Sequence, residues 1–74
     1  MERPLVDAMN WFANHRQEWI AESLRVYGYI NREHLMIKFG ISMPQASADL
    51  QQFLRDRPGV MRYDSSMKKY LAIC

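Results

Sequence analysis

The chain has 74 residues, of which 49% are apolar and 24% are charged, a single cysteine and a formal net charge of +2. This length supports one small domain, and the apolar and aromatic content is typical of a packed core rather than of a disordered chain. A single cysteine excludes an intrachain disulfide. No segment has the apolar length of a transmembrane span or the layout of a signal peptide, so we expect a cytoplasmic protein.

The charged and titratable side chains limit the function classes. Residues 1–40 hold five basic and five acidic side chains, whereas residues 41–74 hold five basic and three acidic ones, so the excess positive charge lies in the second half. Such a bias suits a polyanionic partner. The histidines, His15 and His34, stand apart, and no Gly-rich phosphate loop, nucleophile elbow or paired-carboxylate motif is present. We therefore expect neither an enzyme nor a bound metal or cofactor.

Residues 1–27 are predicted to form a long amphipathic helix, because they contain no glycine and their apolar residues recur at helical spacing. A break is expected near Asn14 and His15, which have poor helix propensity. Trp11 lies off the apolar stripe, and two interpretations of it remain open: a contact between two copies of the chain, or cover for a short N-terminal turn. The stripe itself consists of Leu5, Met9, Phe12, Trp19, Ile20, Ser23, Leu24 and Tyr27.

Two further helices separated by a tight turn are predicted between Gly28 and residue 57. Gly28 is expected to end the first helix, and Tyr29-Ile30 is a short stretch that can pair with a hairpin elsewhere. Asn31 is a good N-cap for a short helix that ends at Gly40. A short helix, a tight turn and another helix form a helix-turn-helix unit.

The helix that follows Gly40 has two distinct faces. Ser42 is expected to be its N-cap and to form a capping box with Gln45. One face is apolar and consists of Ala46, Leu50, Phe53 and Leu54. The opposite face is small, neutral and rich in hydrogen-bonding groups, and consists of Pro44, Gln45, Ala48, Gln51 and Gln52, with Ser47 at its border.

This polar face is predicted to be the recognition face of a DNA-binding helix. Gln can bond bidentately to adenine in the major groove, and Ser can bond either partner of a base pair. A solvated surface helix shows a similar face, so the prediction depends on the rest of the chain. Asp49, on the flank of the helix, is unfavourable beside phosphate and is expected to pair with a neighbouring arginine.

Two strand-like runs, residues 60–63 and 68–73, flank an Asp64-Ser65-Ser66 loop and predict a hairpin. Pairing of Tyr63 with Tyr70 is the expected register. Three helices followed by a hairpin are the arrangement of a winged helix-turn-helix domain.

The predicted fold is therefore α+β and mostly α. A single domain, residues 1–74, is expected to contain an extended N-terminal helix or helices (1–27), a helix-turn-helix (31–57) and a wing (60–73).

Three segments resemble one known domain: GYINREHL (28–35), FGISMPQASADL (39–50) and PGVMRYDSSMKKYLA (58–72). Together they are similar to the N-terminal winged helix-turn-helix of WYL-domain transcriptional regulators that repress bacterial anti-phage defence loci. The resemblance covers roughly residues 16–72. It implies sequence-specific binding of double-stranded DNA by a homodimer, with the third helix in the major groove and the wing on the backbone or in the minor groove.

The resemblance places Ser42, Gln45 and Ser47 at the DNA-facing start of the third helix. It also matches three basic residues to the wing, where they can bind phosphates, although a charged hairpin also protects an edge strand from pairing. The residues themselves add Met43 beside DNA sugar, Gln51 on the polar face, and Arg32, which either clamps the backbone or is solvated. The predicted DNA-binding set is thus Arg32, Ser42, Met43, Gln45, Ser47, Gln51, Arg62, Lys68 and Lys69.

Members of this family continue into a ligand-sensing WYL domain and a C-terminal dimerisation region, which these 74 residues do not contain. The chain is therefore either an excised domain or a free-standing small protein of phage or plasmid origin, and no small-molecule effector is expected. The leading hypothesis is a bacterial or phage transcription regulator, such as a repressor. The alternative is a winged helix used for protein contact, which the neutral recognition face and Trp11 would suit.

Overall fold

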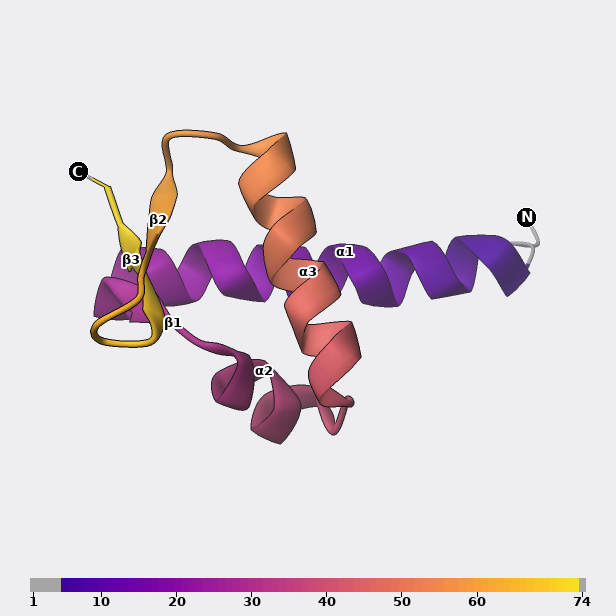
Figure 1. Ribbon diagram of the computed structural model, residues 1–74. Helices are drawn as coiled ribbons and strands as arrows, with labels where there is room; N and C mark the ends of the chain where they lie inside the picture. Colours follow the sequence, from indigo (N-terminus) through magenta and orange to yellow (C-terminus); the bar gives the residue numbers. More distant parts are fainter. Residues whose placement is uncertain (1–4, 74) are drawn as a thin grey trace.

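The computed structural model describes the backbone of residues 5–73 and the side chains from Trp11 to Ile73. Residues 1–4, where the first helix was expected to begin, lie outside this described part. The described residues form three helices and a small three-stranded antiparallel sheet, as expected (Figure 1). The elements are α1 (Leu5–Tyr27), β1 (Tyr29–Ile30), α2 (Arg32–Phe39), α3 (Met43–Asp56), β2 (Met61–Asp64) and β3 (Lys69–Ala72). No described helix is both long and apolar enough to cross a membrane.

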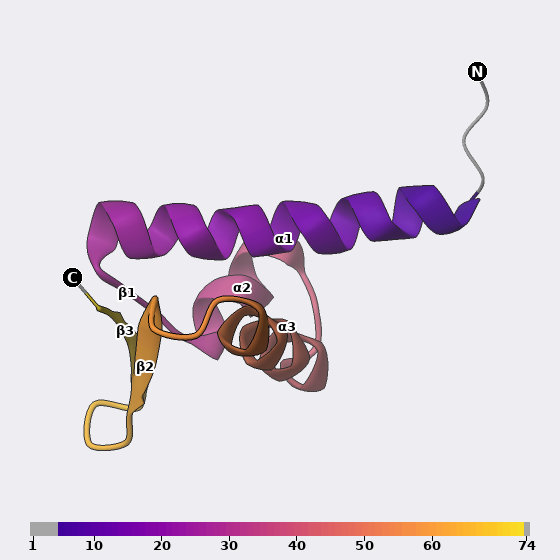
Figure 2. The same ribbon diagram turned by 90° about the horizontal axis from the view of Figure 1, so that it is seen from above.

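Helix α1 is continuous, so the expected break at Asn14 and His15 is wrong. Each residue of poor propensity costs only a few tenths of a kcal/mol in a helix. Side-chain contacts support the helix at this point, since the His15 ring stacks on Trp11, with centroids 5.3 Å apart, and meets Phe39 of α2 edge-on. The N-terminal half of α1 extends past the other elements (Figures 1 and 2).

Among its described side chains, the apolar stripe of α1 is buried only where the rest of the domain lies beneath it; the side chains of Leu5 and Met9 lie outside the described part. Ile20, Ser23 and Leu24 are buried, as expected. Phe12 and Tyr27, in contrast, are 59% and 71% exposed, so the prediction is wrong at these two positions. Phe12 belongs to the projecting half of the helix, and Tyr27 is its last residue. Helical spacing therefore identified the stripe but not how much of it is covered.

Helix α2 begins and ends as expected, with one feature that the sequence did not suggest. Asn31 is its N-cap, and its side-chain oxygen accepts a hydrogen bond from the backbone N–H of His34 at 3.0 Å. The His34 Nδ1 atom accepts from the Asn31 N–H in return, which completes a capping box. Gly40 ends the helix in the left-handed region, at φ +63°, and its N–H bonds to the Met36 carbonyl.

The predicted apolar face of α3 is the centre of the core. Ala46, Leu50 and Phe53 are fully buried, and Leu54 is half-buried at the border. Every other element contributes at least one buried side chain to the same cluster, which adds Ile20, Leu24, Ile30, Leu35, Met61 and Tyr70. In Figure 2, where α3 is seen nearly end-on, α1 lies on one side of it and the sheet on another. One side of α3 is left uncovered.

The sheet has the order β1-β3-β2, and the expected register is confirmed, because Tyr63 pairs with Tyr70 and their rings lie 4.9 Å apart. The short stretch Tyr29–Ile30 pairs with β3, as predicted. Both wing strands begin one residue later than expected, and Asp64 belongs to β2 rather than to the loop. The loop that joins them is therefore residues 65–68.

A pair of isoleucines tests this account of the core. Ile20→Val is expected to lower the free energy of unfolding by about 0.5–1.5 kcal/mol, because Ile20 is fully buried and the lost methyl leaves a gap. Ile37→Val makes the same change on a helix residue that is 83% exposed, and is expected to cost less than about 0.5 kcal/mol. Urea denaturation followed by circular dichroism measures both. Equal losses would contradict the assignment of Ile20 to the core.

Candidate nucleic-acid interface

The uncovered face of α3 carries the predicted DNA-reading side chains. Ser42 is the N-cap of α3, and its hydroxyl oxygen accepts a hydrogen bond from the backbone N–H of Gln45 at 3.3 Å. Ser42, Met43, Gln45 and Gln51 are exposed, and Ser47 is half-buried. Their exposure and position along one helix make them available to a partner that lies along α3.

The second half of the expected capping box at Ser42 does not form. Instead of returning to the Ser42 backbone, the Gln45 side chain donates from Nε2 to Asp49 Oδ1, one turn further along the helix, at 3.0 Å. A hydrogen bond to a charged carboxylate is stronger than one between two neutral groups, which explains why the Gln45 side chain bonds to Asp49 rather than to the Ser42 backbone. Gln45 is thus held at the surface by a neighbour on its own helix.

Asp49 is only 4% exposed and pairs with an arginine, as predicted, but the arginine comes from α1. Arg16 donates from Nε to Oδ2 at 2.6 Å and from Nη2 to Oδ1 at 3.3 Å. The neighbouring Gln17 also donates to the Asp49 backbone carbonyl at 2.8 Å. These bonds fix α3 to α1 and keep the negative charge of Asp49 away from the exposed face of α3.

A hollow of about 360 Å³ lies between α3, the start of α2 and the wing, by which we mean β2, β3 and the loop 65–68. It brings together four of the predicted residues, Arg32, Ser47, Gln51 and Lys68, with Asn31, Leu54, Tyr63 and Tyr70 also lining it. Arg32 Nη1 lies 3.5 Å from the Ser47 hydroxyl, and Gln51 donates to the Tyr70 hydroxyl at 3.3 Å. Of the described residues that line this hollow, two are cationic and none is acidic, which suits an anionic ligand.

Two predicted phosphate contacts lie elsewhere. In the register of the sheet, Arg62 and Lys69 share the face that carries Tyr29, opposite the face of Tyr63 and Tyr70. The Lys69 ammonium sits 4.2 Å from the centre of the Tyr29 ring, a cation–π contact. Arg62 Nη1 lies 3.9 Å from Asp64 Oδ2. Because successive side chains of a strand point to opposite faces, the sequence alone could have placed Arg62 and Lys69 on the face opposite Lys68. Which of the two faces turns towards α3 was not evident from the sequence.

The wing loop is held by Asp64, a role that the sequence analysis missed. Asp64 Oδ1 accepts from the backbone N–H groups of Ser66 and Met67 at 2.9 and 3.0 Å, and also from the Ser66 hydroxyl. An Asp followed by two serines is a signal for such a turn. The loop places Lys68 at φ +56°, in the left-handed region, and the Lys68 side chain lines the hollow.

Trp11 lies in the N-terminal half of α1 and does not line this hollow. Its side chain is 51% exposed and touches Phe12 edge-on, with ring centroids 5.0 Å apart. Helix α1 runs unbroken from Leu5 to Tyr27, so no separate N-terminal turn lies within the described residues, and both interpretations of Trp11 remain predictions.

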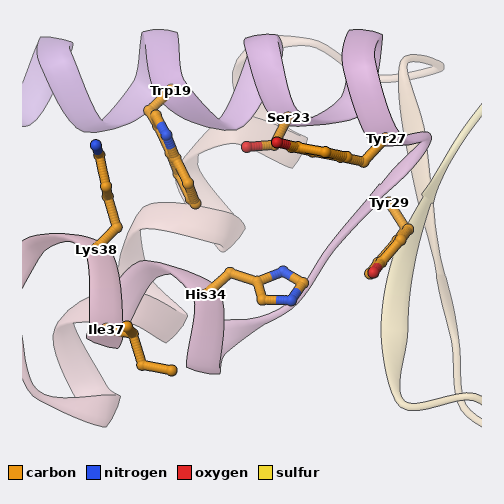
Figure 3. Close-up of a pocket in the computed structure, with 7 residues that line it drawn as sticks. All are labelled: Trp19, Ser23, Tyr27, Tyr29, His34, Ile37 and Lys38. Carbon is orange, nitrogen blue, oxygen red and sulfur yellow. The ribbon is translucent and has the colours of Figure 1, made fainter.

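A second hollow, of about 350 Å³, lies between α1, α2 and β1 (Figure 3). Its walls are mainly apolar and aromatic, and consist of Trp19, Ser23, Tyr27, Tyr29, His34, Ile37 and Lys38. All the predicted DNA-binding residues are described, and none of them lines it. Within the described part of the chain, no three His, Cys, Asp or Glu side chains are grouped to hold a metal ion.

A helix-turn-helix whose second helix is exposed on one face, with a β-hairpin beside it, defines a winged helix-turn-helix domain. Comparison with known families agrees. Residues 13–73 match the model of the BrxR transcriptional regulator winged helix-turn-helix domain, and the chain belongs to this family. The predicted resemblance to the DNA-binding domain of transcription regulators is thereby confirmed.

Curated relatives carry the name DNA-binding transcriptional repressor CapW. The protein of this name from Escherichia coli (strain KTE188) is 43% identical over 60 residues, which are 81% of this chain and 20% of the relative. Those from Pseudomonas aeruginosa and Stenotrophomonas maltophilia are 39% identical over 62 and 72 residues, which cover 84% and 97% of this chain. The matches span 21% and 24% of these two relatives, so the chain corresponds to less than a quarter of their length.

The Asp64 turn gives a prediction about pH. The Ser66 hydroxyl and the backbone N–H groups of Met67 and Ser66 hold the pKa of the Asp64 carboxyl below its ordinary value. A lowered pKa in the folded state means that the turn is fully stabilised above the ordinary value of about 3.9 and loses this stabilisation as the pH falls through the lowered pKa. The amide signals of Ser66 and Met67 in ¹H–¹⁵N NMR spectra are therefore expected to titrate together with a midpoint below about 3.9.

Asp64→Asn is the matched control, because an amide oxygen can still accept these bonds but does not titrate in this range. In this variant the low-pH transition of the two amides should be absent. A midpoint at or above the ordinary aspartate value in the unmodified protein would contradict the prediction.

Proposed function

We propose that this chain is the DNA-binding domain of a bacterial or phage transcriptional repressor, and that it recognises a specific double-stranded site in the cytoplasm through α3 and the wing. The observation that carries the proposal is the cationic hollow beside the exposed polar face of α3. The family of the chain and the names of its curated relatives support the same function.

In the proposed complex, α3 lies in the major groove, whose width of about 12 Å admits a helix. Gln45, Ser47 and Gln51 would contact base edges, since each carries a hydrogen-bonding group on the uncovered side of α3. Ser42 and Met43 would lie against the sugar-phosphate backbone at the start of the helix. The positive end of a helix dipole favours a phosphate at that position.

Arg32 and Lys68 are the proposed phosphate contacts beside α3. Both line the hollow, one at the start of α2 and the other in the wing loop, so a backbone that follows the hollow would meet both. Arg62 and Lys69 lie on the other face of the sheet and would contribute longer-range attraction, which salt screens over about 10 Å.

The proposed active form is a homodimer that contacts its partner through the exposed Trp11 and the adjacent Phe12. Large aromatic side chains are enriched among the residues that contribute most to protein interfaces. These two lie in the N-terminal half of α1 and do not line the hollow, so a partner there would leave the hollow free. Two copies would read two half-sites spaced by about 10 base pairs or a multiple of this.

Binding to DNA is tested by titrating a fluorescent duplex from upstream of the protein's own gene against a scrambled duplex, at two salt concentrations, with anisotropy as the readout. Tighter binding to the native duplex and a steep loss of affinity at higher salt are expected, because the phosphate contacts release counterions. Equal weak binding to both duplexes, or none, would refute the proposed function.

Two lysine variants locate the phosphate contacts. Lys68→Ala is expected to weaken binding to both duplexes by a similar factor. Because one phosphate contact is lost, the slope of log K against log salt concentration should become shallower by about 0.9. Lys69→Ala removes the same charge from the opposite face of the sheet and should leave this slope nearly unchanged. Equal slopes for the two variants would contradict the assignment of Lys68.

The dimer is tested with Trp11→Ala in sedimentation equilibrium without DNA. This variant is expected to shift towards monomer, because half of the Trp11 surface is exposed and would be buried against the partner. Val26→Ala is the control, since Val26 is similarly exposed but lies near the other end of α1. This variant should remain dimeric. A monomeric unmodified protein, or a Trp11→Ala variant that dimerises as well as Val26→Ala, would exclude this interface.

A further inference from the structure

A chain of hydrogen bonds connects the long helix α1 to a side chain on the exposed face of α3. Arg16 of α1 holds the Asp49 carboxylate with two N–H groups, at 2.6 and 3.3 Å. Asp49 in turn accepts from the Gln45 amide nitrogen at 3.0 Å. The first two side chains are largely buried, whereas Gln45 is exposed. A buried ion pair is therefore in direct contact with a predicted base-reading residue.

The chemistry of the carboxylate decides which end of the Gln45 amide faces it. An ionised carboxylate accepts hydrogen bonds and donates none, so the amide NH₂ must face Asp49 and the carbonyl oxygen Oε1 must point elsewhere. A glutamine without such a neighbour can turn its amide over and present either group. Asp49 removes this freedom from Gln45.

The groups that remain free on Gln45 are Oε1 and one N–H of the amide. Adenine offers a complementary pair in the major groove, because its N6 amino group donates and its N7 accepts. Guanine offers two acceptors, N7 and O6, so Oε1 would face O6 without a hydrogen between them. The orientation imposed by Asp49 thus favours adenine over guanine at the position that Gln45 meets.

We infer that Asp49, held by Arg16, is a positioning residue that fixes the Gln45 amide to read adenine. This inference rests on the proposed DNA-binding function and adds the base at one position and the residue that sets it. Asp49 itself does not contact DNA.

The test selects duplexes from a pool with a randomised core and sequences the fraction bound by the full chain. The unmodified protein is expected to enrich a consensus in which one adenine depends on Gln45, so that Gln45→Ala loses the preference at that position alone. Asp49→Asn is expected to reduce the preference for adenine over guanine at the same position by about fivefold or more, the discrimination of a bidentate contact. An asparagine can donate as well as accept, so the Gln45 amide is free to turn over.

Arg16→Gln is the matched control for the structural role of the ion pair. It removes the ion pair between α1 and α3, as Asp49→Asn does, but keeps the carboxylate beside Gln45. If Asp49 acts only by holding the two helices together, both variants will change the base preference alike. The inference requires that Arg16→Gln retain the adenine preference, even where overall affinity falls.

Circular dichroism and thermal unfolding check that each variant is folded. Where Asp49→Asn alone does not fold, the double variant Arg16→Gln/Asp49→Asn replaces the ion pair by two neutral amides and is compared with Arg16→Gln. A consensus that Asp49→Asn leaves unchanged, or that does not depend on Gln45, overturns the inference while the proposed function stands. The absence of any consensus for the unmodified protein overturns both.

Discussion

The domain is organised around α3, which has an apolar face and a polar face on opposite sides. The apolar face of α3 is fully buried at Ala46, Leu50 and Phe53, and all other helices and strands pack side chains into the cluster that forms around it. The polar face gains nothing from burial in that core, because glutamine and serine side chains would lose their hydrogen bonds to water. Burial of one face therefore dictates that the other is presented to the surroundings.

The orientation of this helix depends on a contact with α1 that is both polar and buried. Apolar packing alone allows small changes in volume and angle, whereas the Arg16–Asp49 pair has a defined geometry. Such a pair is costly to desolvate, and breaking it by removal of one partner leaves an uncompensated charge. The same pair keeps the carboxylate away from the surface that we propose for DNA, so one interaction serves both the fold and the electrostatics of the site.

The sheet gives the wing two chemically different faces. Tyr63 and Tyr70 face the hollow beside α3, where Tyr70 bonds to Gln51, while Lys69 packs on Tyr29 on the other side. Lys68 reaches the hollow because the Asp64 turn places it in the loop rather than in the strand. Adjacent lysines thus have different surroundings, although the sequence presents them as one basic cluster.

The sequence by itself determined the elements, their order and most of their ends. Local signals suffice for these features, because the caps at Asn31 and Ser42, the turn at Gly40 and the apolar stripe of α3 depend on residues close together in the chain. The register at Tyr63 and Tyr70 was predictable for the same reason. The tertiary structure decided how far the stripe of α1 is covered, which arginine pairs with Asp49 and which wing cations share a surface with α3. These features join residues far apart in the chain, such as Arg16 and Asp49, and no local pattern encodes the packing angle that brings them into contact.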